Sequence, residues 1–272
     1  MGVFTTTEWQ LLGSLVVAHL LGDFLLQTDD DVKGKQQLFA SKYLKHSLTV
    51  TGLGYVLAGV WTSWLIPTFL LTTHLIIDGL KEIGCRRRAK KPANGKLSSG
   101  FKLWAFLFDQ FLHLLALAGI ALYISRATES PLFSLFWFTR FGLVWGRLLV
   151  LASGLVMTVH VGGVIIGLLV EPFLDQLRGA RDEAKLSVEA RGFENGGKVI
   201  GQLERALIFL FVVTGQPAGV GFLVTAKSVF RFGELKDLQN RMEAEYIIIG
   251  TLMSFGWGLL WAWLTQFLVQ RL

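Results

Sequence analysis

The stretch AHLLGDFLLQ (residues 18–27) places a histidine and an aspartate, His19 and Asp23, inside an otherwise apolar run. Runs of about 20 apolar residues recur along the chain, and a helix needs about that length to cross the hydrocarbon layer of a membrane. Hydrophobic residues make up 52% of the 272 residues. The sequence therefore predicts an all-α fold, a polytopic transmembrane helical bundle.

The apolar runs indicate about eight spans. They cover residues 9–27, 46–66, 67–81, 102–124, 143–170, 198–215, 218–232 and 245–268. Pro67 and Pro217 are expected to mark tight turns between neighbouring spans. Residues 1–124 are predicted to be a four-span bundle and residues 198–272 a three-span bundle. Residues 125–197 are predicted to be a linker with one long span and a cytoplasmic amphipathic segment.

The basic residues indicate how these spans are oriented. With the N-terminus outside, the segments 28–46, 81–102, 171–198 and 227–245 share one side of the membrane, and they hold 21 of the 26 Lys and Arg residues. Cytoplasmic loops carry such an excess of basic residues. We therefore expect both termini outside and a multi-pass protein of a bacterial inner membrane or an equivalent one. This asymmetry accounts for the net charge of +6 without a nucleic-acid partner.

Three of the first four predicted spans carry the same pair of ionisable residues. Each pair is one histidine and one aspartate four residues apart, which puts both side chains on one face of a helix. The pairs are His19 with Asp23, His74 with Asp78, and Asp109 with His113. An ionisable residue inside a span costs several kcal/mol on most scales, so a functional site is the first hypothesis.

The order of the two residues follows the direction of each span. The first and third spans run towards the cytoplasm with histidine first, whereas the fourth runs outward with aspartate first. All three helices therefore present histidine deeper and aspartate about 6 Å nearer the cytoplasm, at about 1.5 Å of rise per residue. We expect one layer of three imidazoles and a next layer of three carboxylates, in the inner half of the bilayer.

These donors predict a divalent-metal site. Imidazole and carboxylate together suit Zn, with Mn or Fe as alternatives, and two layers equally suit two metals. The predicted ligands are His19, Asp23, His74, Asp78, Asp109 and His113. The predicted catalytic groups are Asp23, Asp78, Asp109 and His46, the last of which begins the second span. Cys85 is the only cysteine, which excludes an internal disulfide and a cysteine-cluster metal site.

Four short motifs carry a resemblance to known families. HLLGDFLLQ (19–27), KHS (45–47), HLIIDGLK (74–81) and DQFLH (109–113) together resemble a bacterial membrane-protein family catalogued only as a domain of unknown function. The stretches GKVIGQLERALI and EYIIIGTLMS resemble the C-terminal part of its longer members. The first half is also distantly similar to membrane-bound metal-dependent hydrolases, whose Thr-His-Ser motif here reads KHS. That similarity implies metal-dependent hydrolysis, although the Asp-x-Asp-His cluster of those hydrolases is absent from this sequence.

Further polar residues near the predicted cytoplasmic ends of the spans are expected to bind substrate. They are Gln27, Lys81 and Gln110 near the His/Asp pairs, and Arg205, Lys227 and Arg231 in the last three spans. The basic set suits an anionic headgroup near the inner surface. Alternatively, Glu204 pairs with Lys227, and Arg231 with Glu245, as clamps between helices.

Three functions are consistent with these features. The first is a metal-dependent hydrolase that acts on a lipid or amphiphile from the inner leaflet. The second is an ion, metal or proton-coupled transporter, which requires polar layers that continue outward. The third is a non-catalytic membrane scaffold whose segments 28–45 and 172–197 dock a partner protein. The expected partners are membrane lipid, a lipid-like substrate and, from small residues at Gly250, Ser254 and Gly258, a second copy in a homodimer.

Overall fold

The computed structural model describes residues 5–36, 40–90, 97–127, 135–183, 195–232 and 241–272. All regular elements among these residues are helices, so the predicted all-α fold is confirmed. The chain divides into two compact units. The first comprises Met1–Val156 with Leu272, and the second comprises Met157–Arg271. The predicted three-part division of the chain stays a prediction.

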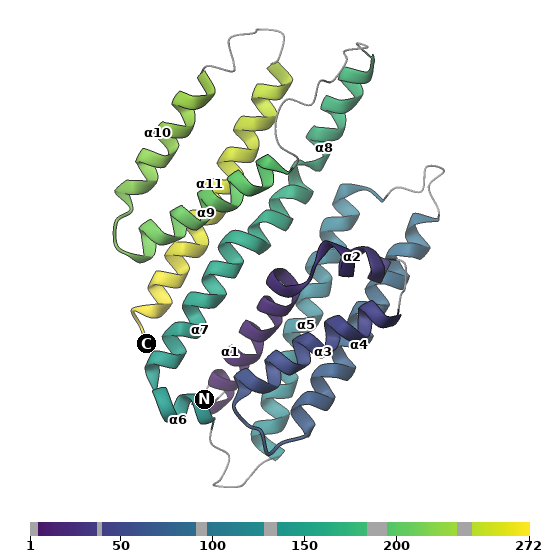
Figure 1. The fold of residues 1–272 in the computed structure, drawn as a ribbon, viewed down its shortest axis with the longest axis vertical. Coiled ribbons are helices and arrows are strands. Elements are labelled where there is room, and N and C mark those ends of the chain that lie inside the picture. The colour runs from purple at the N-terminus through teal and green to yellow at the C-terminus, as the bar shows by residue number, and fades with distance from the viewer. Residues whose placement is uncertain (1–4, 37–39, 91–96, 128–134, 184–194, 233–240) are drawn as a thin grey trace. The chain divides into compact units, whose positions relative to one another are not determined.

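Four long helices form the bundle of the first unit. They are α1 (Thr6–Leu21), which continues as the π-helix η1 (Gly22–Leu26), α3 (Ala40–Ala58), α4 (Leu65–Ala89) and α5 (Ser99–Ala127). Helix α1 packs on α3 and α5, and α4 packs on the same two helices, so the four enclose a common interior (Figure 1). Three further helices complete the unit, and α2 packs on α3 while α7 packs on α1. They are α2 (Asp29–Gln36), α6 (Phe136–Phe141) and α7 (Leu143–Val156).

Apolar side chains fill one end of this interior. The core includes Leu11 and Leu15 of α1, Ala58 of α3, Ile66 and Leu70 of α4, and Leu117, Ile120 and Ile124 of α5. These positions precede the histidines of α1 and α4 along the chain and follow those of α3 and α5. The core therefore lies on the side of the histidines that is remote from α2. In a membrane, close packing rather than the hydrophobic effect holds such a core together.

Helix α1 begins at a capping box. The Thr5 hydroxyl accepts a hydrogen bond from the Glu8 amide at 3.3 Å, and Glu8 Oε2 accepts one from the Thr5 amide at 2.5 Å. Two backbone donors that the helix leaves free are thereby satisfied. Glu8 Oε1 also lies 3.5 Å from Arg126 Nε, so the start of α1 is tied to the end of α5.

The turn between α3 and α4 lies earlier than predicted. Helix α3 ends at Ala58, and Gly59 adopts a φ of +67° that a side chain would disfavour. Pro67 is the third residue of α4, where its missing amide hydrogen has no partner to lose. Pro67 therefore lies in the first helical turn of α4 and not in the loop between α3 and α4. Pro217, in contrast, stands immediately before α10 as predicted.

The second unit is a separate set of helices. It comprises η2 (Met157–Val161), α8 (Gly162–Glu183), α9 (Gly196–Val213), α10 (Ala218–Phe232) and α11 (Arg241–Val269). Helix α11 packs on α8 and α9, and α10 packs on α9.

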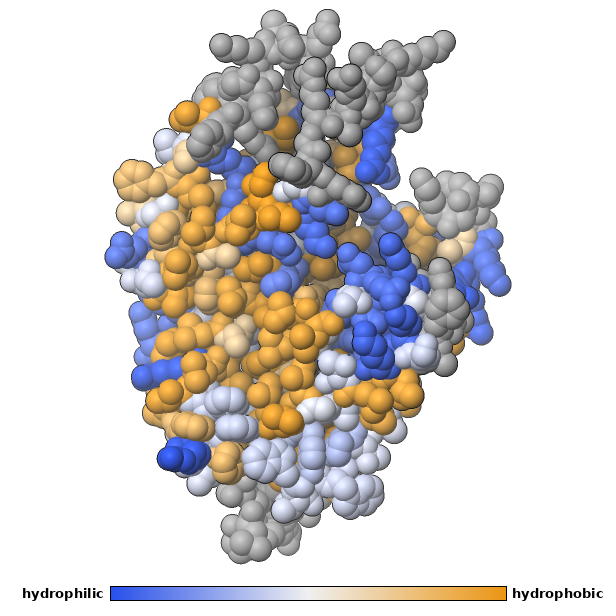
Figure 2. All heavy atoms as spheres, viewed as in Figure 1, coloured by the Kyte–Doolittle hydropathy of each residue, from blue (hydrophilic) through white to orange (hydrophobic). Residues whose placement is uncertain are grey.

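Among the described residues, four helical segments are long and apolar enough to cross a membrane. They are Thr6–Leu26, Ser99–Arg126, Leu143–Gly179 and Met242–Val269, and Ala218–Val229 is a shorter apolar helix. Large apolar side chains are exposed on the helix surfaces, including Phe222 (78%) and Trp104 (72%), and apolar residues cover much of the visible face in Figure 2. Exposed apolar surface of this extent is typical of a lipid-facing protein. The number of passes and the side of each terminus stay predictions.

Candidate metal centre

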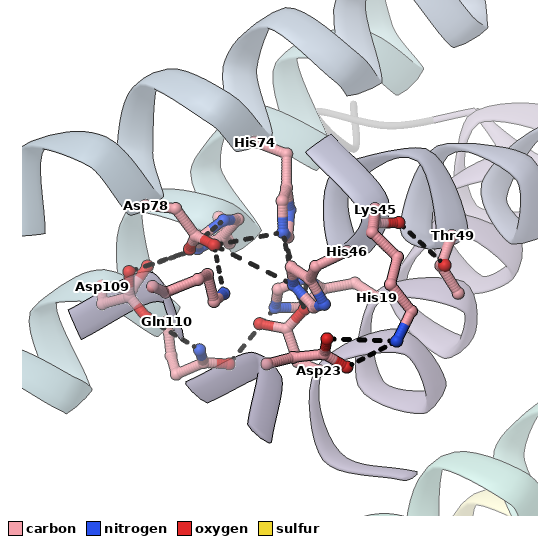
Figure 3. Close-up of polar contacts among 12 residues, drawn as sticks. His19, Asp23, Lys45, His46, Thr49, His74, Asp78, Asp109 and Gln110 are labelled. Carbon is pink, nitrogen blue, oxygen red and sulfur yellow. Dashed lines mark hydrogen bonds and ion pairs between the residues drawn. The ribbon is translucent and has the colours of Figure 1, made fainter. Parts of the chain in front are cut away.

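Seven histidine and aspartate side chains among the described residues converge in the first unit (Figure 3). Helices α1, α3, α4 and α5 contribute one histidine each, and η1, α4 and α5 contribute one aspartate each. They are His19, His46, His74, His113, Asp23, Asp78 and Asp109. Six of these residues are buried, and the Asp23 side chain is 9% exposed. The structure thus brings together all six predicted ligands and adds His46 to them.

The imidazoles of His19, His74 and His113 lie at one level, as expected from the direction of their helices. The His113 ring centroid is 4.7 Å from that of His19 and 4.6 Å from that of His74. One ring nitrogen from each histidine lies within 4.8 Å of the other two. The carboxylates do not form a separate layer, because Asp23 and Asp78 both reach among the imidazole nitrogens.

The π-helix η1 accounts for the position of Asp23. Its turns are wider than α-helical turns, and such insertions are frequent at functional sites. Gly22 opens this segment against α3, because a Cβ there would lie 2.5 Å from Val50 Cγ2. This close approach and the widened turn bring Asp23 Oδ1 to 3.3 Å from His46 Nε2.

Four donor atoms from η1, α3 and α4 lie in one group. Asp23 Oδ1 is 3.3 Å from His46 Nε2 and 3.7 Å from His74 Nε2. Asp78 Oδ2 is 3.9 Å and 3.7 Å from the same two nitrogens, which are 2.9 Å from each other. Ligands of a tetrahedral zinc, at about 2.0–2.1 Å from the metal, lie about 3.3 Å apart. The separations in this group are close to those of ligands that share one ion.

Asp78 also faces a second group of donors. Its Oδ1 lies 3.8 Å from His113 Nε2, and Asp109 Oδ1 lies 3.7 Å from His113 Nδ1. One ligand atom from each of these three residues lies within 4.8 Å of the other two. The two oxygens of the Asp78 carboxylate therefore point towards different imidazoles.

Hydrogen bonds assign the proton positions of two histidines. His113 Nδ1 lies 3.0 Å from the Asp109 carbonyl oxygen, which only accepts, so Nδ1 carries the hydrogen and Nε2 presents a lone pair. Gln110 Nε2 donates to Asp109 Oδ2 at 3.1 Å, which turns the Gln110 oxygen to His19 Nε2 at 3.2 Å. His19 Nδ1 then faces Asp23 Oδ1 at 3.6 Å. His19 Nδ1, which then carries no hydrogen, and Asp23 Oδ1 are both acceptors. A cation, either a proton or a metal ion, is therefore required between them.

Unsatisfied buried atoms show that the residues fit a divalent cation. Asp23 Oδ1, Asp109 Oδ1 and His113 Nε2 have no hydrogen-bond partner among the residues described. A buried acceptor left without a partner costs about 1–3 kcal/mol, and more when it is charged. Buried charges are normally paired or coordinate a metal. Divalent cations coordinated by these residues would give the three atoms the partners they lack.

A family model described as "Protein of unknown function (DUF3307)" matches residues 11–139. Residues 11–139, called here the DUF3307 domain, are similar to this family. The predicted resemblance to an uncharacterised family is therefore confirmed, and these residues contain all seven histidines and aspartates of the candidate centre. Searches of the curated proteins and of the solved structures found no match. The distant similarity to metal-dependent hydrolases stays a prediction.

The DUF3307 domain brings a lysine into the centre that is not among the residues predicted from sequence. Lys35 of α2 is buried, and its Nζ lies 2.5 Å from Asp78 Oδ2. In the amide orientation that satisfies both neighbours, Gln27 accepts from Lys35 Nζ at 2.8 Å and donates to the Asp23 carbonyl oxygen at 3.2 Å. Lys35 stands in a Lys-rich polar segment, which by pattern alone is typical of a solvated loop. The contact between Lys35 and Asp78 forms because α2 folds back onto the bundle, which the sequence pattern does not indicate.

Helix α2 of the DUF3307 domain is held in place by Asp31. This buried carboxylate accepts a hydrogen bond from the Thr28 hydroxyl at 2.7 Å and two from Lys45 Nζ at 3.1 Å each. The hydrogen bonds from Thr28, and then those from Lys45, lower the pKa of Asp31 to about 2. The Asp31 contacts therefore fix the helix that delivers Lys35 to the centre.

All three of the predicted substrate-binding residues in the domain have specific partners. Lys81 Nζ lies 3.1 Å from Asp109 Oδ2, and its side chain remains 30% exposed at the edge of the centre. The Gln110 amide bridges His19 and Asp109, so it orients a candidate ligand. Gln27 contacts Lys35 rather than open space.

The predicted basic substrate-binding residues outside the DUF3307 domain belong to the second unit. Arg205 is buried and donates to the Val159 carbonyl oxygen at 2.9 Å and 3.3 Å and to Ser254 Oγ at 3.0 Å. Lys227 Nζ lies 2.6 Å from Glu204 Oε2, as expected for an interhelical clamp. The side chain of Arg231 is outside the described residues, so its expected pairing with Glu245 stays a prediction.

Proposed function

We propose that the DUF3307 domain is a metal-dependent hydrolase that acts on a lipid or amphiphile at the cytoplasmic side of a bacterial inner membrane or an equivalent one. The observation that carries the proposal is the four-donor group, in which Asp23 Oδ1 and Asp78 Oδ2 each lie 3.3–3.9 Å from the Nε2 atoms of His46 and His74. Imidazole and carboxylate ligands suit zinc, with Mn and Fe as alternatives. A divalent metal there, if it takes water or substrate as a fifth ligand, would polarise a substrate oxygen and lower the pKa of a bound water.

The other residues of the centre orient ligands and face the substrate. Gln110 holds His19 in one tautomer, and the Asp109 carbonyl does the same for His113. Oriented imidazoles of this kind support metal affinity and activity. Lys81 is the partly exposed cation at the edge of the centre, so it is placed to contact an anionic headgroup.

An apolar core on one side of the centre favours an enzyme over a transporter. The apolar core from Leu11, Leu15, Ile66 and Leu117 closes the bundle on one side of the imidazoles, whereas Lys35 and other polar groups lie on the other side. A transport path needs polar groups on both sides of the binding site. A purely structural His/Asp network is also disfavoured, because it would leave Asp109 Oδ1 and other buried atoms unsatisfied.

Metal content tests the proposal. Detergent-purified protein would be stripped with a chelator, incubated with zinc, separated from free ions and measured by mass spectrometry. We expect wild type to retain stoichiometric zinc, and His74→Ala and Asp23→Asn to lose at least tenfold in affinity while remaining folded. His160→Ala is the matched control, because this histidine belongs to the second unit, and we expect it to retain metal.

Turnover tests the reaction class. The zinc-loaded protein would be incubated with membrane lipid extract, and released water-soluble products would be identified by mass spectrometry. We expect products from wild type and His160→Ala and none from His74→Ala. Equal zinc retention in wild type and His74→Ala would contradict the metal site, and products that do not depend on zinc would contradict the hydrolase.

A further inference from the structure

We propose that Asp78 bridges two metal ions, one held with Asp23, His46 and His74 and the other with Asp109 and His113. This inference rests on the proposed metal centre and extends it. Its starting observation is that Asp78 Oδ2 lies 3.7 Å from His74 Nε2 whereas Asp78 Oδ1 lies 3.8 Å from His113 Nε2. A carboxylate whose two oxygens face two donor sets is the usual bridge of a two-metal site, which clamps the attacking and leaving oxygens of a displacement.

The number of donors exceeds what one ion takes. Four histidines and three aspartates converge, whereas protein-bound zinc takes four ligands in structural sites and three with an open position in catalytic sites. The first group already supplies four donor atoms to a single ion. His19, Asp109 and His113 are then left as additional buried donors.

Unsatisfied atoms occur in both groups. Asp23 Oδ1 belongs to the first group, whereas Asp109 Oδ1 and His113 Nε2 belong to the second. Asp109 and His113 are each 3% exposed, so bulk solvent does not reach their buried atoms. One ion in the first group would leave the second pair unsatisfied, and a second ion removes that cost.

The charge balance indicates the class of substrate. The three aspartates carry three negative charges, and Lys35 and Lys81, each paired with one of them, carry two positive charges. With neutral histidines the centre has one net negative charge, and two divalent ions make it cationic. An anionic group such as a phosphate ester offsets this excess, and Lys81 at the edge is placed to bind it.

Metal stoichiometry in single variants tests the bridge. Manganese would be loaded into chelator-stripped wild type, Asp23→Asn, Asp109→Asn and Asp78→Asn, with content measured by mass spectrometry and spin coupling by electron paramagnetic resonance. We expect two ions and an exchange-coupled signal in wild type. We expect one ion and an uncoupled signal in Asp23→Asn and in Asp109→Asn, and loss of coupling in Asp78→Asn. His160→Ala is the control and should match wild type.

The outcomes separate this inference from the proposed function. One ion in wild type, retained in Asp109→Asn and lost in Asp23→Asn, would overturn the two-metal centre and leave a single-metal enzyme. No retained ion in wild type would overturn the proposed function itself. Circular dichroism and gel filtration of each variant would show that a lost ion reflects a lost ligand and not an unfolded chain.

Discussion

Lys35 Nζ and Asp78 Oδ2 lie 2.5 Å apart in the interior of the bundle, although the lysine comes from a polar segment between two apolar helices. Both side chains are buried, so the pair is a strong interaction only because each charge compensates the other. The lysine thus supplies a positive charge to a carboxylate that also faces three imidazoles. This relationship couples α2 to the proposed metal centre.

Lys35→Met is expected to make the protein more dependent on metal. The substitution leaves Asp78 buried without its ammonium partner, and loss of one partner of a buried pair costs about 3–5 kcal/mol. Zinc would compensate the freed carboxylate, so zinc should raise the thermal unfolding temperature more in the variant than in wild type. Lys33→Met, on an exposed position of α2, should behave like wild type. An equal effect of zinc on wild type and Lys35→Met would contradict the coupling.

Gly22→Ala is expected to destabilise the contact between α1 and α3. The added Cβ would lie 2.5 Å from Val50 Cγ2, and overpacking of this kind costs about 1–3 kcal/mol. Val50→Ala in the same chain should restore much of the loss, since it removes the opposing methyl groups. Gly52→Ala has open space around the new Cβ and should be neutral or stabilising. Denaturant unfolding in detergent would measure the stability of wild type, Gly22→Ala, Gly52→Ala and the Gly22→Ala/Val50→Ala double variant. A double variant no more stable than Gly22→Ala would contradict the packing.

The docking of α2 is expected to weaken at strongly acidic pH. The folded-state pKa of Asp31, about 2, lies below its ordinary value of 3.8, so its contribution to stability is present above pH 3.8. That contribution is lost as the pH falls through about 2. Thr28→Val removes the first hydrogen bond and should move the loss to higher pH. Carbon NMR titration of the Asp31 carboxyl would measure both values, and an unshifted pKa in wild type would contradict the contact.

Arg205→Lys is expected to destabilise the second unit by about 1–3 kcal/mol, because a lysine cannot keep both the Val159 carbonyl and the Ser254 hydroxyl paired. Arg178→Lys, at an exposed position of α8, is the control and should change unfolding by less than about 0.5 kcal/mol. Unchanged unfolding in Arg205→Lys, combined with weaker binding to anionic lipid vesicles, would favour a headgroup site instead.

Much of the candidate centre follows from sequence spacing. The four-residue interval between His74 and Asp78, and its reversal in Asp109 and His113, places the polar groups on facing helices at one depth, as the structure has them. Two features depend on tertiary structure and leave no local signal. The widened turn at Asp23 places its carboxylate among the imidazoles and not in a separate layer. Helix α2 packs against the bundle and thereby buries Lys35.

The helix limits were predictable where apolar and polar segments alternate. Runs of apolar residues identify the long helices, but hydropathy does not separate a proline within the first turn of a helix from one in a loop. Pro67 is therefore inside α4, and the positive φ of Gly59 marks the turn. Helix α3 has a polar first half and an apolar second half, so it is not among the segments that meet the length and hydropathy criteria for a span.

X-ray absorption at the zinc edge of the zinc-loaded protein tests the central claim most directly. We expect a first shell of nitrogen and oxygen at about 2.0–2.1 Å, with the outer-shell scattering of at least two imidazoles, and its loss in His46→Ala and His74→Ala. A shell of solvent oxygens alone, or a sulfur ligand from Cys85, would contradict a His/Asp metal centre in this domain.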